Sequence, residues 1–426
     1  MCLASIFPWT GEGQPASDMK FDIFFSICQT EVNGHTPSEK QMFLNFFDQL
    51  RLADDLGFGT AWVAETHLSC QIQKENPGAV IPQFRGEIGL NTDILQLAHL
   101  AFAQTKKIHV GSAIRNIICN GGPIAHAEAV KTFLSLHGLR ENEQRKLHLG
   151  FAAGRFPFSN TPYGFHPQND FEFAAWDVIK NKYFQQAVEI FLRLLGGEHI
   201  SSRDLSSRIM TEGDFRDSEQ WQKCLKVAKN ADLVDKEKIV LYNHWEFEKV
   251  GVIPFEAPLN LLDLTLGSHD PETQILANQF APVGVFNLSI TPTPVIEETH
   301  ARMARHYHKS GGTWTRDRMP RTLLLFVDDN PGVSDQEKSA RAKAAARSAW
   351  ENYWKAMEGT LDPKKVEAAV GNTMAGHPQE LVDKIREKYH DDDRLMLWFD
   401  FNNHDSQRVK ESMKIFMDKI ATKLDE

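Results

Sequence analysis

The sequence contains little cysteine. Its 426 residues include five cysteines, which are scattered along the chain and form no Cys-x-x-Cys pair. An odd, dispersed set of this kind fits a reducing compartment and argues against a disulfide framework or a zinc site. We therefore predict a cytoplasmic protein without a structural or catalytic metal ion.

Long apolar runs and basic stretches are also missing. No apolar stretch reaches roughly 18 residues, the length that spans a bilayer, and residues 1–20 have neither a basic start nor a long apolar run, so we read them as an N-terminal arm and not a secretory signal. The 47 basic residues are outnumbered by 57 acidic ones, with both signs mixed along the chain. Nothing in this pattern would neutralise nucleic-acid phosphates, so neither a membrane nor a nucleic-acid partner is expected.

Short apolar runs followed by helix-like stretches recur eight times. They are rich in Val, Ile, Leu and Phe and too short for helices, as expected of strands that are buried on both faces. The runs span residues 21–27, 60–64, 108–114, 146–152, 259–266, 283–289, 322–327 and 394–401. This layout predicts an α/β fold, a (β/α)8 TIM barrel, whose active site would lie on the loops that follow the strands.

Two segments are longer than the loops that a minimal barrel needs. Residues 69–91 follow the second strand and are long for a strand-to-helix loop, so we predict a lid over the barrel mouth. Residues 201–258 precede the fifth strand and form a larger, mostly polar insertion, with a helix expected near residues 220–229. The prediction is one domain over residues 21–426 that carries both insertions.

Several motifs resemble the bacterial luciferase-like flavin-dependent monooxygenases. Residues 53–67 read Ala-Asp-Asp-Leu-Gly-Phe-Gly-Thr-Ala-Trp-Val-Ala-Glu-Thr-His, which is similar to the signature that runs from the first helix into the second strand. Further similar segments follow in the order found in the family: residues 108–113, Pro123 with Ala127 and Glu128, residues 149–155, residues 267–281 and residues 376–381. The resemblance covers roughly residues 21–419, apart from the two insertions.

The resemblance implies an enzyme that binds reduced flavin mononucleotide (FMN), reacts it with O2 and oxygenates a small organic substrate. A separate reductase would supply the reduced flavin, since no Gly-x-Gly-x-x-Gly nicotinamide fingerprint follows a strand. The family also suggests a homodimer and a non-prolyl cis peptide near Ala113 and Ile114. Thr66 replaces the first of two adjacent histidines of luciferases, so a non-luminous member is implied.

Polar residues after the strands are the candidate cofactor ligands. Ser268 and Thr273 lie at the start of a helix after the fifth strand, where free N–H groups and the helix dipole favour a phosphate, and Arg155 after the fourth strand can add a charge-assisted contact. Ser268 taken alone is more readily a turn or cap residue, but Arg155 and the family resemblance make phosphate binding the better interpretation. We also assign Ala113 and Asn116, at the end of the third strand, to the flavin site.

Glu65 and His67 are the candidate catalytic residues. They lie two residues apart at the end of the second strand and therefore face the same way, where they can hold the flavin edge or move protons. Hydrogen bonds that merely fix the lid loop are an equally good interpretation.

Three alternatives to an oxygenase differ in what they require of the sequence. A deazaflavin-dependent hydride-transfer enzyme of the same superfamily and a flavin-binding protein without turnover both remain open. A metal-dependent barrel hydrolase would need His and Asp ligands at several strand ends, and the first strand offers none.

Overall fold

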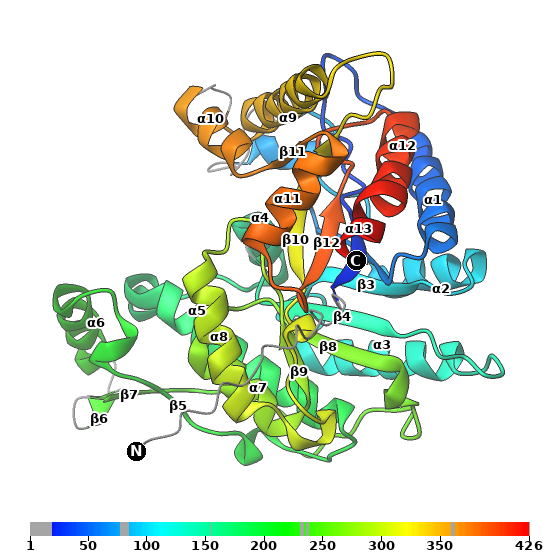
Figure 1. The fold of residues 1–426 in the computed structure, drawn as a ribbon. Coiled ribbons are helices and arrows are strands. Elements are labelled where there is room, and N and C mark those ends of the chain that lie inside the picture. The colour runs from blue at the N-terminus through cyan, green and yellow to red at the C-terminus, as the bar shows by residue number, and fades with distance from the viewer. Residues whose placement is uncertain are drawn as a thin grey trace, which may run out of the picture.

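The computed structural model describes residues 19–76, 85–154, 156–230, 234–235, 238–358 and 363–425 (Figure 1). Its main sheet has nine strands, all paired in parallel, in the order β11-β10-β12-β1-β2-β3-β4-β8-β9. The strands are β1 (Lys20–Phe25), β2 (Thr60–Val63), β3 (His109–Asn116), β4 (Leu147–Ala152), β8 (Leu262–Leu266), β9 (Val283–Val285), β10 (Arg321–Val327), β11 (Met374–Gly376) and β12 (Arg394–Trp398).

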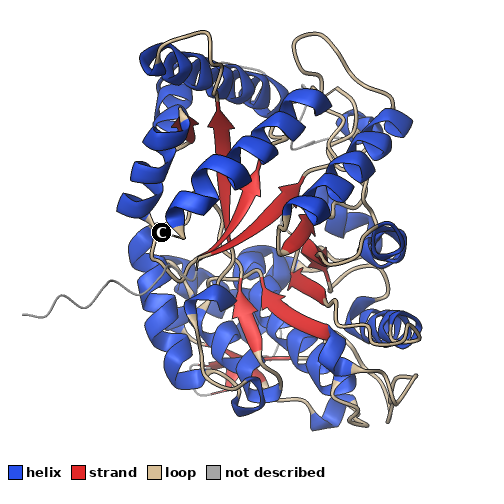
Figure 2. Ribbon diagram, turned by 45° about the vertical axis from the view of Figure 1, so that its right-hand side comes forward, coloured by secondary structure: helices blue, strands red, loops and turns tan. Residues whose placement is uncertain are grey.

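Helices surround this sheet, and Figure 2 shows the strands gathered in the interior. The helices are α1 (Glu39–Leu56), α2 (Ile94–Gln104), α3 (Gly122–His137), α4 (Pro157–Asn160), α5 (Asp170–Leu195), α6 (Ser218–Asn230), α7 (Pro271–Phe280), α8 (Thr293–His306), α9 (Asp335–Glu358), α10 (Pro363–Gly371), α11 (Pro378–Lys388), α12 (Ser406–Phe416) and α13 (Thr422–Leu424). One large apolar cluster joins most of the strands to the helices that cover them, as burial of a parallel sheet requires.

The sheet is curled like a TIM barrel, but its hydrogen-bonded ladder does not close. Each of the eight predicted runs contains a strand, yet β9 and β10 are joined only by an isolated parallel bridge between Asn287 and Arg321. Backbone N–H groups after β9 donate to side chains instead, Leu288 to Thr291 Oγ1 (3.0 Å) and Ser289 to Thr322 Oγ1 (2.7 Å). The predicted closed (β/α)8 barrel is thus corrected to an open, curled sheet.

Both ends of α1 follow local rules. The Ser38 side chain accepts a hydrogen bond from the Gln41 N–H group and caps α1. At the other end, Gly57 adopts a φ of 88° and its N–H group donates to the Ala53 carbonyl (3.1 Å). Glycine reaches this left-handed conformation without steric cost, and β2 therefore begins only three residues later.

The two predicted insertions have structure of their own. Residues 201–258 contain α6, as expected, and a small antiparallel sheet in the order β5-β7-β6, built from β5 (Arg208–Met210), β6 (Val234–Asp235) and β7 (Lys238–Leu241). The predicted lid includes a 3-10 turn, η1 (Gln71–Glu75), while residues 77–84 lie outside the described residues, as does most of the N-terminal arm.

Neither a membrane span nor a metal cluster is found in the described parts of the chain. Among those residues, no helix has the length and apolar character needed to cross a bilayer. The same residues contain no group of three His, Cys, Asp or Glu side chains that could hold a metal ion.

Candidate active site

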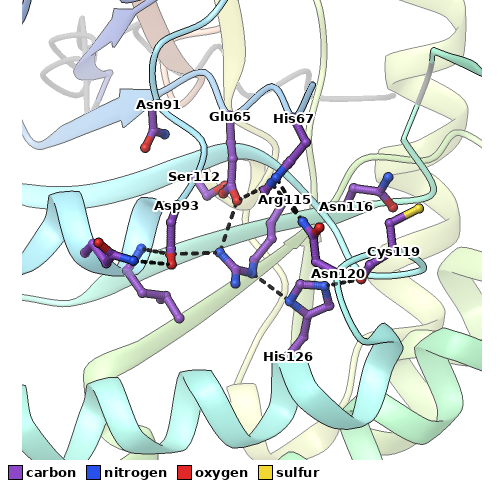
Figure 3. A network of polar contacts seen from close by, with 12 residues as sticks. Glu65, His67, Asn91, Asp93, Ser112, Arg115, Asn116, Cys119, Asn120 and His126 are labelled. Atoms are coloured by element: carbon purple, nitrogen blue, oxygen red, sulfur yellow. Dashed lines mark hydrogen bonds and ion pairs between the residues drawn. The ribbon is translucent and has the colours of Figure 1, made fainter. Parts of the chain in front are cut away.

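Glu65 and His67 lie beside β3 at the carboxyl end of the sheet (Figure 3). The Glu65 side chain is completely buried and accepts three hydrogen bonds. One carboxylate oxygen, Oε1, contacts His67 Nε2 (2.9 Å) and Arg115 Nη1 (3.1 Å), and Oε2 accepts from Ser112 Oγ (3.1 Å). Both oxygens are therefore occupied by neighbours from β3 and from the loop that follows β2.

Arg115 connects this carboxylate to the start of α3. Its Nη1 lies 3.4 Å from Asp93 Oδ1, and its Nε donates to His126 Nδ1 (2.9 Å). The other ring nitrogen of His126 lies 2.8 Å from the Cys119 carbonyl. Because Nδ1 accepts from the arginine, Nε2 must carry the proton and donate to that carbonyl. Burial, and then the nearby Arg115 charge, lower the pKa of His126 to about 3, so this imidazole is neutral.

His67 is the exposed end of the same network. Its side chain is 12% exposed, whereas that of Glu65 is fully covered. The Asn120 amide donates to His67 Nδ1 (2.9 Å), which leaves Nε2 to donate its proton to Glu65. The carboxylate thus sets the tautomer and orientation of the ring. In this geometry His67 can meet a ligand, while Glu65 acts through His67 and is a positioning residue.

Ala113 forms part of an apolar surface at the carboxyl ends of the strands. The partly buried side chains of Ala64, Ala113, Ile114 and Trp398 pack against one buried cluster inside the sheet, and we call these four residues the apolar floor. The peptide bond between Ala113 and Ile114 is cis, which confirms the expectation for this position. A Cβ atom on Gly267 would lie 2.5 Å from the Ile114 side chain, so only glycine allows the β8 loop to approach the floor this closely.

Asn116, the other predicted ligand on β3, is buried in a separate contact. Its Nδ2 donates to Asn160 Oδ1 (2.8 Å), and its Oδ1 accepts from the Ile118 N–H group (3.2 Å). A Cβ atom on Gly154 would lie 2.3 Å from Asn116 Nδ2, and Gly154 has a φ of 66°. Asn116 therefore fixes the loop after β3 against α4, with its amide already satisfied.

The predicted phosphate ligands Ser268 and Thr273 differ in what they can offer. Thr273 is fully buried, and its hydroxyl and N–H groups both donate to Asp270 Oδ2, which caps α7. Ser268 is partly exposed, and its Oγ accepts from the Asp270 N–H group (3.2 Å). The Ser268 hydroxyl hydrogen has no acceptor among the described residues, so Ser268 is the better donor of the two.

A lysine that the sequence analysis missed lies near the end of β4. Arg155 itself is outside the described residues. Lys180 of α5 donates to the Gly154 carbonyl (2.7 Å), and burial lowers its pKa. No motif marks this residue, because it reaches the strand end from a helix that starts 16 residues after Gly154.

Asp400, just beyond β12, is a second missed residue. Its Oδ2 accepts from the Ser26 N–H group (3.2 Å) and hydroxyl (3.0 Å), which links the ends of β12 and β1. Burial raises the pKa of Asp400 to about 6, although the hydrogen bonds from Ser26 act in the opposite direction. A carboxyl group with such a pKa can exchange protons near neutral pH. The sequence offered no sign of it, since the shift depends on burial.

Comparisons with known proteins place the fold among solved oxidoreductases. No family model and no curated protein matches the sequence. The structure is similar to the monooxygenase RslO1 from Streptomyces bottropensis, with a TM-score of 0.64 and 17% identity, over 95% of this chain and 99% of that one. It is also similar to the oxygenating constituent of 3,6-diketocamphane monooxygenase from Pseudomonas putida in complex with FMN (TM-score 0.58, 14% identity, 96% and 99% covered). A third is the EDTA monooxygenase of Chelativorans sp. BNC1 (TM-score 0.53, 12% identity, 96% and 93% covered). At these identities the likeness establishes that the chain shares the fold of these three monooxygenases.

Proposed function

We propose that this protein is a luciferase-like flavin-dependent monooxygenase that uses reduced FMN and O2 to oxygenate a small organic substrate. The observation that carries the proposal is the apolar floor at the carboxyl ends of the strands, with His67 and Ser268 on loops of the same rim. The fold is also that of a monooxygenase solved with FMN. Active sites of curled parallel sheets of this kind lie at this end.

The residues present fit a flavin. The floor of Ala64, Ala113, Ile114 and Trp398 is apolar and partly exposed, which suits one face of a flat ring system. The Ser268 hydroxyl and the Lys180 ammonium group are the donors that would hold the phosphate. When bound, reduced FMN supplies the electrons for the reduction of O2.

His67 is the side chain that we assign to the reacting end of the site. Glu65 accepts a hydrogen bond from His67 Nε2, and Asn120 donates one to His67 Nδ1, so the ring is held in one orientation. An imidazole held in this way can form a hydrogen bond with a substrate only when one of these two partners is displaced. We propose that the substrate displaces Asn120, because the uncharged amide is the weaker of the two hydrogen-bond partners.

The proposal also covers a partner protein, the oligomeric state and the cellular compartment. A separate reductase would deliver the reduced flavin, and the protein would act as a homodimer in the cytoplasm. Exposed leucines on neighbouring helices support a dimer, since Leu100 of α2 and Leu136 of α3 are 49% and 53% exposed, followed by Leu139 at 78%. Apolar side chains that gather on one surface are typical of protein interfaces.

Anaerobic titration with reduced FMN, and separately with a reduced deazaflavin cofactor, tests the proposal. We expect saturable binding of reduced FMN. After mixing with aerated buffer, the flavin spectrum should show that bound reduced FMN returns to the oxidised form more slowly than free reduced FMN does. Ser268→Ala should weaken binding about tenfold, as expected for a lost hydrogen bond to a charged group. Ser310→Ala, at the opposite end of the barrel, is the matched control.

Three other results would contradict the proposal. Preference for the deazaflavin would indicate hydride transfer. Binding of reduced FMN with oxidation as fast as that of free flavin would indicate a binding protein without turnover. Absence of binding to both cofactors would exclude a flavin enzyme altogether.

A further inference from the structure

A second cavity lies at the amino ends of the strands, away from the candidate active site. It has a volume of about 870 Å³. Residues at or just before the start of the strands line it, namely Lys20, Gly59, His109, Lys146, Leu262 and Arg394. All strands of the main sheet run in parallel, so these residues share one end of the barrel and the loops with Glu65, His67 and Ser268 share the other. The proposed oxygenase chemistry makes no use of this cavity.

Most charges around the cavity are already paired. Lys20 forms an ion pair with Asp317, and Lys146 Nζ lies 3.1 Å from Asp263 Oδ1. Arg394 Nε contacts the buried Asp22 at 2.6 Å. The two histidines of the lining, His109 and His148, have pKa values lowered by burial and then by nearby Arg394, so they are neutral at pH 7.

Arg318 lines the same cavity and differs from these cations in its partners. Within the described part of the chain, no carboxylate oxygen lies within 4.0 Å of its guanidinium group. Its Nη2 donates to the Gly311 carbonyl (2.9 Å), and the group lies 4.8 Å above the Tyr307 ring. Its Nε is buried with no hydrogen-bond partner in the structure. Protein atoms cover Nε, so an anionic ligand in the cavity would contact the guanidinium group through its other nitrogens and compensate its charge there.

Apolar side chains also line the cavity. Leu192 and Leu195, near the end of α5, and Phe280, at the end of α7, form one wall of the cavity. Its volume falls within the roughly 300–1,000 Å³ of pockets that bind small molecules. An inorganic ion would leave this apolar wall facing water, so the lining suits a larger anion.

We propose that the cavity at the amino ends of the strands binds a small organic monoanion with an apolar body. The anionic group is held by Arg318, and the apolar body lies against Leu192, Leu195 and Phe280. This site is separate from the proposed flavin site, so one can fail without the other.

Fluorescence titration with 8-anilinonaphthalene-1-sulfonate, an aromatic sulfonate, tests the site in the full-length protein. We expect one molecule bound per chain. Arg318→Gln should weaken binding at least about tenfold, as expected for a charged hydrogen bond. Ala281→Trp, which places a large side chain in the cavity without touching the charge, should abolish binding. Arg203→Gln is the matched control, because Arg203 is 82% exposed and lies on residues 201–258.

The possible results distinguish dye binding at this site from dye binding at the flavin site, and loss of the site from loss of the fold. Thermal denaturation of each variant identifies loss of fold, and Ala281→Trp keeps the test valid where Arg318→Gln does not fold. Unchanged dye binding in both variants would overturn the proposal. Displacement of the dye by FMN would also overturn it, since the dye would then occupy the flavin site. Dye binding that persists at saturating FMN and is lost in both variants would support it.

Discussion

The network around Glu65 shows how the oxygens of a buried side chain are all given partners. Glu65 is paired with Arg115, and Ser112 and His67 donate to its oxygens. Removing one partner of a buried ion pair is costly, because the other charge stays buried without compensation. The sequence left two interpretations open for Glu65 and His67, a catalytic role and a role in fixing the loop. The two are compatible, since the same hydrogen bonds fix the loop and orient the histidine.

Glu65→Gln tests this network at the level of stability. The substitution leaves the buried Arg115 with Asp93 as its nearest carboxylate, at 3.4 Å, so we expect the free energy of unfolding to fall by about 3 kcal/mol. Urea denaturation measures the change. Asp93→Asn is the comparison, because its side chain is 36% exposed and the loss should be smaller. Equal losses would show that Glu65 is not the main partner.

His126 predicts sensitivity to acid. Its pKa is lowered from 6.5 to about 3 by burial and by Arg115. A lowered pKa in the folded state means that the contribution to stability is complete above pH 6.5 and is lost as the pH falls toward 3. We therefore expect the difference in melting temperature between the wild type and His126→Asn to shrink over that range. His35→Asn, at an exposed position, should show no such change.

Asp400 predicts the opposite dependence. Burial raises its pKa from 3.8 to about 6, so its contribution to stability is complete below pH 3.8 and is lost as the pH rises through 6. Asp400→Asn should therefore gain stability relative to the wild type between pH 4 and pH 7, as measured by thermal denaturation. Asp55→Asn, on the exposed side of α1, is the control. A constant difference across this range would refute the pKa shift.

Element boundaries were predictable where short-range chemistry determines them. Asp270 before Pro271 and His377 before Pro378 cap α7 and α11 as their sequences indicate, because a cap needs only a side-chain oxygen or nitrogen within one turn. Strand length was less predictable. The run at residues 283–289 is a regular strand only as far as Val285, and beyond the single bridge at Asn287 its N–H groups donate to the Thr291 and Thr322 side chains. The short β11 had no distinct apolar run.

The cap of α7 gives a prediction at this scale. Asp270 accepts from both the N–H and hydroxyl groups of Thr273. Asp270→Ala should lower the free energy of unfolding by about 1 kcal/mol, the usual value for a lost cap, as measured by urea denaturation. Asp270→Ser, which retains a capping oxygen, should recover most of the loss. If Asp270→Ser is as destabilised as Asp270→Ala, the carboxylate contributes through Gln185 instead, whose Nε2 lies 3.2 Å away.

At the scale of the whole molecule, the exposed leucines near the end of α3 predict the oligomeric state. Sedimentation velocity should give about twice the mass of one chain. The double variant Leu136→Asp with Leu139→Asp should sediment as a monomer, because two charges would be buried without partners in the interface. Leu44→Asp is the control, since Leu44 is 54% exposed on α1. Dimers that persist in the double variant would place the interface elsewhere.

The sequence by itself determined the succession of buried strands, the caps of α7 and α11 and the resemblance on which the proposed function draws, because burial patterns and caps depend on residues close together in the chain. Only the tertiary structure decided that Glu65 contacts Arg115 and that Asn116 and Thr273 bond within the protein. It also decided that Arg318 lines a cavity with no carboxylate partner among the described residues. These contacts join residues from different strands and helices. They depend on the curvature and register of the sheet, which no local pattern specifies.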